Sequence, residues 1–234
     1  MKKVAFITGT SKGIGKAITE LLLNKDYIVF GYSRTNTINH SNFTFTKIDL
    51  SNLEKVKKIT FPKLDNDVLL INNAAQIGSI MPLNIKEDTN IINEYNLNII
   101  TPTLFCAKFI NTYNNNNKLI LNVSSGAANN AIASWNTYCS TKSALDSLTS
   151  VIKEEKHNNL SIFSIHPGII DTQMQKEIRK SDPNLFPLLN KFTNYHTNNQ
   201  LEKPKNIAER FVYIIQNHEK FDQNIISIRD ININ

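Results

Sequence analysis

A serine, a tyrosine and a lysine lie within residues 125–142, which read SGAANNAIASWNTYCSTK. Tyr138 follows Ser125 by thirteen positions, and Lys142 follows Tyr138 by four. If residues 135–150 are helical, Tyr138 and Lys142 share one face of the helix. A free phenol has a pKa near 10, about three units too high for a proton donor at neutral pH, and a nearby ammonium lowers that pKa. We therefore predict that Tyr138 is a general acid tuned by Lys142.

Ser125 follows the apolar residues 118–123, which predict a buried strand. Ligands bind at the carboxyl ends of strands in open α/β sheets, so the serine hydroxyl is expected where a substrate would bind. A tyrosine and a lysine four residues apart are, by themselves, more often a contact on a helix surface. The catalytic interpretation therefore depends on the other motifs of the chain.

The amino-terminal residues predict a strand, a glycine-rich turn and a helix. Residues 3–8 (KVAFIT) are apolar, residues 9–15 read GTSKGIG, and residues 16–23 have helical spacing. Glycines at these positions permit a tight turn, close approach of the backbone to a ligand and close packing of the helix on the sheet. The amino end of a helix attracts phosphate, so this turn predicts a pyrophosphate site. The residues expected there are Gly9, Ser11, Lys12, Gly13, Ile14 and Gly15.

Together with two further motifs, these segments resemble the short-chain dehydrogenase/reductase family. The four motifs are residues 8–15, residues 72–75 (NNAA), Ser125 with Tyr138 and Lys142, and residues 167–172 (PGIIDT). The similarity runs from Lys3 to about Arg229. It implies a single-domain α/β Rossmann fold, with a doubly wound, seven-stranded parallel sheet and helices on both faces. Ala75 departs mildly from the family, which more often has glycine there.

Apolar runs that alternate with helical segments agree with this fold. The predicted strands are residues 4–9, 27–33, 43–49, 68–73, 118–125, 161–167 and 224–228. The 234 residues, 41% of them hydrophobic, suffice for one domain. The resemblance implies that this domain, residues 1–234, is a Rossmann domain that binds NADP. Within it, the polar segment 173–203 carries Phe186, Leu189, Phe192 and Tyr195 and is the expected substrate lid, although these side chains could equally be ordinary helix packing.

Composition excludes several classes of function. No apolar stretch approaches the roughly eighteen residues that span a bilayer, and no signal-peptide pattern is present, so we expect a cytoplasmic protein without membrane contact. Only two cysteines occur, Cys106 and Cys139, which suits a reducing compartment. The net charge of +6 comes from scattered lysines, which argues against nucleic-acid binding. The five histidines lack metal-ligand spacing, so no metal site is expected.

The end of the second predicted strand indicates which cofactor is bound. An NAD site usually has an acidic residue there, whereas residues 31–35 read GYSRT. Arg34 can pair with a 2′-phosphate, and Lys12 can add a second positive charge. We therefore predict NADPH, the alternative being two exposed basic side chains without a ligand.

The resemblance implies further cofactor and catalytic residues. Asp49 and Leu50 would lie along the adenine, Asn73 along the adenosine ribose, and Ile170 and Thr172 near the nicotinamide carboxamide. Ser125 would hydrogen-bond the substrate oxygen that Tyr138 protonates, and Tyr138 and Lys142 would also contact the cofactor, Lys142 at the nicotinamide ribose. Asn98 matches the family's asparagine that anchors a proton-relay water, with Asn96 as the alternative.

Within the family, the carboxyl-terminal half is most similar to sepiapterin reductases and bacterial benzil reductases. Trp135, residues 167–175 (PGIIDTQMQ) and residues 201–204 (LEKP) carry this likeness, which implies a reductase of small dicarbonyls. Asp171 is equally an N-cap candidate for the helix after it. Sepiapterin reductases hold the pterin with a late aspartate, but Ser227 matches that position and Asp230 is three residues further on. This difference favours an aromatic or aliphatic diketone over sepiapterin.

Two other interpretations remain open. A 3-oxoacyl carrier-protein reductase would dock an acidic carrier, for which Lys176, Arg179 and Lys180 are available. A cofactor-binding sensor or scaffold would keep the fold without turnover, but it has no physical need for the complete set of catalytic residues. The resemblance also implies a homodimer or homotetramer built on the helices that carry Asn98 and Tyr138.

Overall fold

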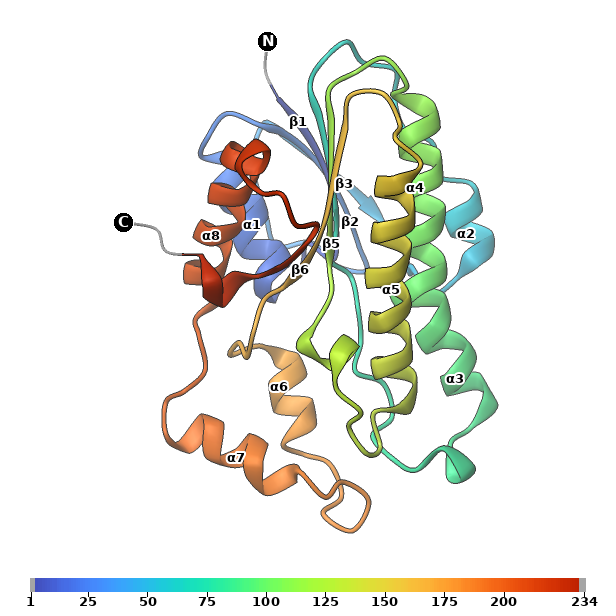
Figure 1. Cartoon of the computed structure of the whole chain (residues 1–234), viewed down its shortest axis with the longest axis vertical. Helices are drawn as coiled ribbons and strands as arrows, with labels where there is room; N and C mark the ends of the chain where they lie inside the picture. Colours follow the sequence, from blue (N-terminus) through green and yellow to red (C-terminus); the bar gives the residue numbers. More distant parts are fainter. Residues whose placement is uncertain (1–2, 232–234) are drawn as a thin grey trace.

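Seven parallel strands form one sheet in the computed structural model, which describes residues 3–231 (Figure 1). The strands lie in the order β3-β2-β1-β4-β5-β6-β7, so the chain begins at the centre of the sheet and reverses its direction of winding once. The predicted doubly wound sheet is confirmed, and every strand boundary agrees within two residues. The strands are β1 (Val4–Thr8), β2 (Ile28–Ser33), β3 (Phe43–Lys47), β4 (Val68–Asn72), β5 (Lys118–Val123), β6 (Leu160–His166) and β7 (Ile225–Ser227).

Helices cover both faces of the sheet. The helices α1 and α8 lie side by side on one face, and α4 and α5 lie on the other (Figure 1). No helix within residues 3–231 is both long enough and apolar enough to cross a bilayer. The helices are α1 (Gly13–Leu23), α2 (Leu53–Lys57), α3 (Asp88–Tyr95), α4 (Thr101–Thr112), α5 (Asn136–Glu154), α6 (Gln173–Ile178), α7 (Leu189–Thr197) and α8 (Pro204–Asn217), with a π-helical segment, Asn96–Ile100, between α3 and α4.

The central strand β1 supplies both halves of the core. Ala5 and Ile7 belong to the apolar cluster under α1 and α8, whereas Val4 and Phe6 belong to the cluster under α4 and α5. Successive side chains of a strand point to opposite faces, so a strand covered on both sides must be apolar at every position. Burial of each large side chain contributes about 1.5–3 kcal/mol to stability. This packing fixes the loops that follow the strands.

The 173–203 segment contains α6 and α7 and lies apart from the two main helix layers (Figure 1). Its ends are tied together, because Ile170 forms a β-bridge with Glu202 and the Asp171 amide donates to the Glu202 carbonyl at 2.9 Å. The N-cap prediction for Asp171 is wrong: Thr172 occupies that position, no side chain caps the helix, and Asp171 is exposed. The strand-like pairing with Glu202 delays the start of the helix by one residue.

Candidate active site

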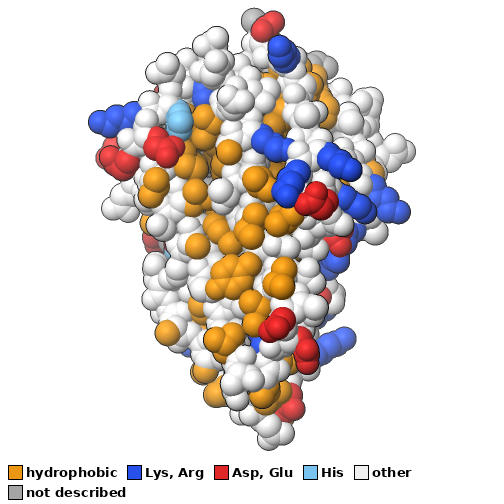
Figure 2. All heavy atoms as spheres, turned by 90° about the vertical axis from the view of Figure 1, so that its right-hand side faces the viewer, with side chains coloured by type: hydrophobic (Ala, Val, Ile, Leu, Met, Phe, Trp, Pro, Cys, Tyr) orange, Lys and Arg blue, Asp and Glu red, His pale blue; other side chains and the backbone are white. Residues whose placement is uncertain are grey.

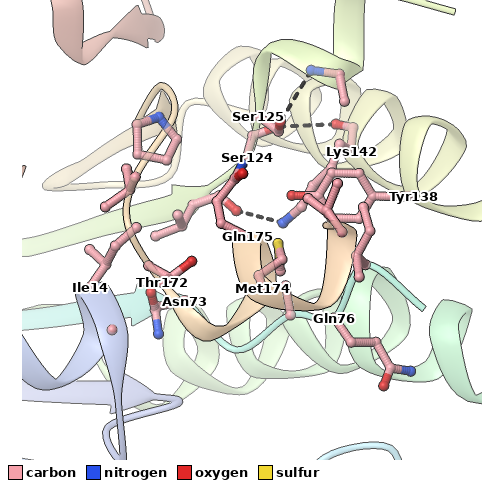
Figure 3. A pocket seen from close by; sticks show the side chains of 18 of the residues that line it. Ile14, Asn73, Gln76, Ser124, Ser125, Tyr138, Lys142, Thr172, Met174 and Gln175 are labelled. Atoms are coloured by element: carbon pink, nitrogen blue, oxygen red, sulfur yellow. Dashed lines mark hydrogen bonds between the residues drawn. The ribbon is translucent and has the colours of Figure 1, made fainter. Parts of the chain in front are cut away.

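A cavity of about 710 Å³ opens at the carboxyl ends of the strands (Figure 3). Loops that follow all seven strands contribute to its lining, and the 173–203 segment closes one side. This position is where open α/β sheets bind ligands. All the predicted cofactor residues line the cavity except Gly15. Of the predicted catalytic residues, Ser125, Tyr138 and Lys142 line it and Asn98 does not.

The glycine-rich turn is held by close backbone contacts. Gly9 and Gly13 have φ angles of 76° and 59°, which residues other than glycine rarely adopt. A Cβ on Gly15 would come within 2.3 Å of the Gly9 carbonyl oxygen and of Asn73 Nδ2. Asn73 Nδ2 itself donates to the carbonyl oxygens of Thr8 and Gly9, at 3.0 and 3.2 Å. Gly15 and Asn73 therefore shape the turn, and Asn73 reaches the cavity as well.

The charge of this part of the cavity suits an anionic cofactor. Lys12 and Arg34 line it, and Asp49 is its one acidic side chain among the described residues. At the end of β2, the cavity is lined by Ser33 and Arg34 and not by a carboxylate. The Ser33 hydroxyl donates a hydrogen bond to the Thr35 carbonyl at 2.7 Å. Partial burial works against ionisation of Asp49, but hydrogen bonds from Ser51 and the charge of Arg34 hold its pKa below the usual value. The turn, the helix end and these cations fit a dinucleotide cofactor.

Ser125, Tyr138 and Lys142 come together at the other part of the cavity (Figure 3). Ser125 follows β5, and its Oγ accepts a hydrogen bond from the Ala127 amide at 3.1 Å. Tyr138 and Lys142 lie one turn apart on α5 and are only 7% and 2% exposed. The Lys142 ammonium donates to the Val123 carbonyl at 2.7 Å and lies 5.6 Å from the centre of the Tyr138 ring.

The predicted lowering of the Tyr138 pKa by Lys142 is wrong for this structure. Burial raises the pKa of Tyr138 to about 12, although a hydrogen bond with Ser125 acts in the opposite direction. Burial also lowers the pKa of Lys142 to about 8, and the charge of Asp146 opposes that change. Removing the phenolate from water is more unfavourable than the hydrogen bond with Ser125 is favourable. Tyr138 is therefore protonated at neutral pH.

The structure distinguishes between Asn98 and Asn96. Asn98 lies in the π-helical segment and is 1% exposed; its Oδ1 accepts from the Gln76 amide at 3.0 Å and its Nδ2 donates to the Gln76 carbonyl at 2.9 Å. Its Nδ2 also approaches Thr141 Oγ1 on α5 at 3.4 Å. Asn96 instead donates to the Ser51 carbonyl at 3.2 Å. Asn98 is thus the residue that connects the catalytic helix to the loop after β4, and π-helical turns often occur at functional sites.

A buried ion pair beside Tyr138 was not predicted from the sequence. Lys86 Nζ lies 2.6 Å from Glu94 Oε2, and the two side chains are 1% and 2% exposed. Lys86 also donates to Thr137 Oγ1 at 2.7 Å, Thr137 donates to Glu94, and Glu94 Oε1 accepts from the Ser79 amide at 2.8 Å. Thr137 precedes Tyr138 in the first turn of α5. The pair therefore ties the catalytic helix to α3 and to the loop before it.

A hydrogen-bonded pair, His166 with Asp146, lies one helical turn beyond Lys142 and was also not predicted from the sequence. His166 Nε2 is 2.8 Å from Asp146 Oδ2, and Ser164 donates to the other carboxylate oxygen at 2.5 Å. His166 lines the cavity just before the Pro167 turn. The only signal in the sequence was the continuation of the helical spacing from Tyr138 and Lys142 to Asp146. Three or more metal-ligating side chains do not gather anywhere within residues 3–231.

The carboxyl-terminal end of the cavity carries a cation. Ser227 lines the cavity, Asp230 does not, and Arg229 between them does. Gly168, at a φ of 78°, leaves room for this guanidinium, because a Cβ there would lie 3.1 Å from Arg229 Nε. The sequence alone leaves open whether Ser227 or Asp230 reaches the substrate and gives no role to Arg229. The structure instead brings a positive charge to this wall.

The remaining wall is apolar and comes largely from the 173–203 segment. Phe192 and Tyr195 line the cavity, whereas Phe186 is 1% exposed and packs behind it against Trp135. Apolar lining with a few convergent polar groups is typical of sites for small molecules. Four further residues of the segment line the cavity without having been singled out from the sequence: Gln175, Ile178, Leu188 and Lys191.

Comparison with known proteins decides the family. The family model described as short chain dehydrogenase matches residues 3–183 of the chain. The protein belongs to the short-chain dehydrogenase family. As predicted, this short-chain dehydrogenase is an oxidoreductase of the branch that contains the benzil and sepiapterin reductases.

Its relatives support this placement. A benzil reductase ((S)-benzoin forming) from Bacillus subtilis (strain 168) is 31% identical over 223 residues, which cover 90% of this short-chain dehydrogenase and 92% of the relative. The sepiapterin reductase of Rattus norvegicus is 31% identical over 146 residues, 59% of this chain and 55% of that protein. The crystal structure of the YIR035C short chain dehydrogenase/reductase from Saccharomyces cerevisiae has the same fold, with a TM-score of 0.83 at 24% identity over 98% of this chain and 97% of that chain.

Proposed function

We propose that this oxidoreductase is an NADPH-dependent carbonyl reductase that reduces one ketone of a small dicarbonyl. The observation that carries the proposal is a single cavity with two unlike parts. One part has the glycine turn, Lys12 and Arg34, and the other has Ser125, Tyr138 and Lys142 beside an apolar wall. A phosphate-binding end joined to a proton donor is what reduction of a ketone by a dinucleotide requires.

The protein residues supply the proton and stabilise the oxygen. Bound NADPH would provide the hydride for the carbonyl carbon, so the carbonyl oxygen gains negative charge as the C–H bond forms. Tyr138 donates its phenolic proton to that oxygen, and the Ser125 hydroxyl hydrogen-bonds the same oxygen. Lys142, whose pKa burial lowers to about 8, is still charged at neutral pH and readily returns a proton to the tyrosinate. Asn98 holds the neighbouring loop and is the proposed start of the path by which that proton is replaced.

The cofactor contacts follow from the lining of the cavity. Arg34 and Lys12 would hold the 2′-phosphate, Asp49 and Leu50 would border the adenine, and Asn73 would border its ribose. Ile170 and Thr172 would contact the nicotinamide end, and Tyr138 and Lys142 would also contact the cofactor, Lys142 at the adjoining ribose. The supporting observation is that all of these residues line one continuous cavity.

Replacing Arg34 with alanine is expected to raise the KM for NADPH by about 10- to 100-fold, since one charge-assisted hydrogen bond contributes about 1.5–3 kcal/mol. The KM for NADH should change by less than about threefold, because NADH has no 2′-phosphate to lose that contact. Initial rates with each cofactor measure both values. Lys47→Ala is the matched control, since Lys47 is an exposed cation at the end of β3 that does not line the cavity. An equal loss with both cofactors would contradict the assignment of Arg34.

A dicarbonyl is preferred over a pterin for an electrostatic reason. A pterin presents a guanidine-like edge that pairs with a carboxylate, whereas the cavity offers Ser227 and the cationic Arg229 at its carboxyl-terminal wall. Arg229 would repel such an edge and would attract a carbonyl oxygen. The apolar wall, with Phe192 and Tyr195, supports hydrophobic substituents on the substrate, and the 173–203 segment is the proposed lid.

The experiment that tests the function follows NADPH oxidation at 340 nm with benzil, smaller 1,2-diketones, sepiapterin and an acetoacetyl thioester. Turnover of a diketone with NADPH preferred over NADH is the expected result. Preference for the thioester would favour a 3-oxoacyl carrier-protein reductase, for which Lys176 and Lys180 remain exposed. NADPH binding without turnover of any compound would favour a sensor or scaffold.

We further propose that the protein is a homodimer or homotetramer. Figure 2 shows hydrophobic side chains gathered on the face that α4 and α5 form. Val151 on α5 is 54% exposed, Ile92 on α3 is 57% exposed, and Ile100 in the π-helical segment is 38% exposed. Exposed apolar clusters of this kind favour association.

Val151→Glu is expected to weaken self-association at least about tenfold, because a buried unpaired carboxylate opposes the contact by more than about 1.4 kcal/mol. Sedimentation velocity over a range of concentrations measures the change. Gln216→Glu adds the same charge on an exposed position of α8, on the opposite face, and should leave association unchanged. A monomeric wild-type protein would refute the proposal.

A further inference from the structure

Arg229 is a cation at the cavity wall that no group of the described protein neutralises. It is exposed, and it forms no hydrogen bond or ion pair with any residue within 3–231. The other cations of the catalytic and cofactor ends have partners or assigned roles: Lys142 donates to the Val123 carbonyl, and Lys12 and Arg34 are the proposed 2′-phosphate ligands. A solvated arginine on an open surface needs no explanation. Arg229 calls for one because of where its guanidinium lies.

The guanidinium of Arg229 lies against the turn that follows β6. A Cβ on Gly168 would come within 3.1 Å of Arg229 Nε, 3.6 Å of Nη2 and 3.7 Å of Cζ. Gly168 and Arg229 both line the cavity. The charged group itself, and not only the backbone of Arg229, therefore lies at the cavity edge, in space that a larger residue at position 168 would occupy.

The order of the strands shows which end of the cavity this cation serves. The strand β7 lies four strands from β1, whose end carries the glycine turn, and this separation is about 19 Å. It lies two strands, or about 10 Å, from β5, after which Ser125 follows. The guanidinium is closer still to Ser125, because it reaches back over the end of β6. Arg229 thus belongs to the end with Ser125 and Tyr138, not to the phosphate-binding end.

The charges that line the cavity are unbalanced. Asp49 is the one acidic side chain among the described lining residues, and it lies beside Arg34 at the cofactor end. The Lys and Arg residues of the lining are Lys12, Arg34, Lys142, Lys191 and Arg229. A guanidinium presents a planar fork of donors that matches the two oxygens of a carboxylate. A ligand with its own negative charge would therefore satisfy Arg229 better than a neutral carbonyl oxygen.

We propose that Arg229 binds a carboxylate of the substrate, so that the preferred dicarbonyls are 2-oxo acids, in which a ketone adjoins a carboxylate. This inference rests on the proposed carbonyl reductase function and names its substrate class. The ketone oxygen lies at Ser125 and Tyr138, and the carboxylate lies at Arg229. Two neighbouring oxygens, each with its own hydrogen bond, span about 8 Å between the two donor atoms, which fits the one to two strand spacings between Ser125 and the guanidinium. The apolar wall then receives the substituent on the ketone.

The first test compares phenylglyoxylate with its methyl ester, which keeps the ketone and the ring but has no charge. Arg229→Gln is expected to lower the ratio of kcat/KM for the acid to that for the ester by about tenfold or more, the value of a charge-assisted hydrogen bond. Lys220→Gln removes the same charge at an exposed position outside the cavity and should leave the ratio unchanged. A ratio that Arg229→Gln leaves within about twofold of the wild-type value overturns the inference. So does an equal loss with both compounds and a higher KM for NADPH, which would make Arg229 a cofactor ligand.

The second test does not require turnover. Isothermal titration calorimetry of the protein saturated with NADP⁺, which has no hydride to give, measures the Kd of each compound. The Kd of phenylglyoxylate should rise about tenfold in Arg229→Gln, and in the wild type it should rise between about 0.05 and about 0.5 M NaCl, whereas the Kd of the ester should do neither. If no ketone is turned over but the acid binds through Arg229, the reductase function fails and the anion site stands. If diketones are reduced but the acid binds equally well to wild type and Arg229→Gln, the function stands and the inference is overturned.

Discussion

Tyr138→Phe is expected to lower kcat by about 100- to 10,000-fold, the range that a positioned general acid contributes. The substitution removes one hydroxyl from a side chain that is 7% exposed and keeps the ring between Trp135 and Lys142. NADPH affinity should change by less than about tenfold, since the lost hydroxyl makes at most one neutral hydrogen bond to the cofactor. Single-turnover rates and a fluorescence titration with NADPH measure the two quantities.

Tyr213→Phe is the matched control for this prediction. Tyr213 lies on α8, on the other face of the sheet, and does not line the cavity. The same loss of a hydroxyl at that position should leave kcat within about twofold of the wild-type value, as is usual away from functional groups. A Tyr138→Phe protein that still reduces the diketone at a rate near that of the wild type would remove Tyr138 from the proton-donor role.

Lys86→Met is expected to lower the free energy of unfolding by about 3–5 kcal/mol, because it leaves the buried Glu94 carboxylate without its cation. Glu94 would retain only the Ser79 amide and the Thr137 hydroxyl as partners. In a chain of this length the loss corresponds to a fall in Tm of about 6 to 20 °C. Equilibrium unfolding in urea, followed by circular dichroism, measures it. Since Thr137 lies next to Tyr138, the rate of reduction should fall as well.

Two further variants separate charge from packing. Lys86→Met combined with Glu94→Gln should recover at least about half of the lost stability, because no unpaired charge remains. Lys57→Met breaks an ion pair with Glu54 whose side chains are 60% and 79% exposed, and should cost less than about 1 kcal/mol. If Lys86→Met lowers the free energy of unfolding no more than Lys57→Met does, the buried ion pair does not hold the catalytic helix in place.

Local patterns in the sequence were sufficient for the fold and for part of the site. Apolar residues located all seven strands within two residues. Strands covered on both faces, such as β1 and β4, are apolar at nearly every position, and the edge strand β3 was marked by its alternating pattern FTFTK. The spacing of Tyr138 and Lys142 fixed their common helix face, because helical geometry depends only on the number of residues between them. The glycines of residues 9–15 likewise marked a turn that only residues without a Cβ can form.

The tertiary structure alone decided the electrostatics and the long-range partners. The direction of the Tyr138 pKa shift depends on burial, which cannot be read from the spacing to Lys142, and burial reversed the predicted shift. Lys86 and Thr137 are 51 residues apart, and nothing local to either position predicts their contact. Sequence determines conformation through neighbours in the chain, whereas burial, charge state and hydrogen-bond satisfaction depend on neighbours in space.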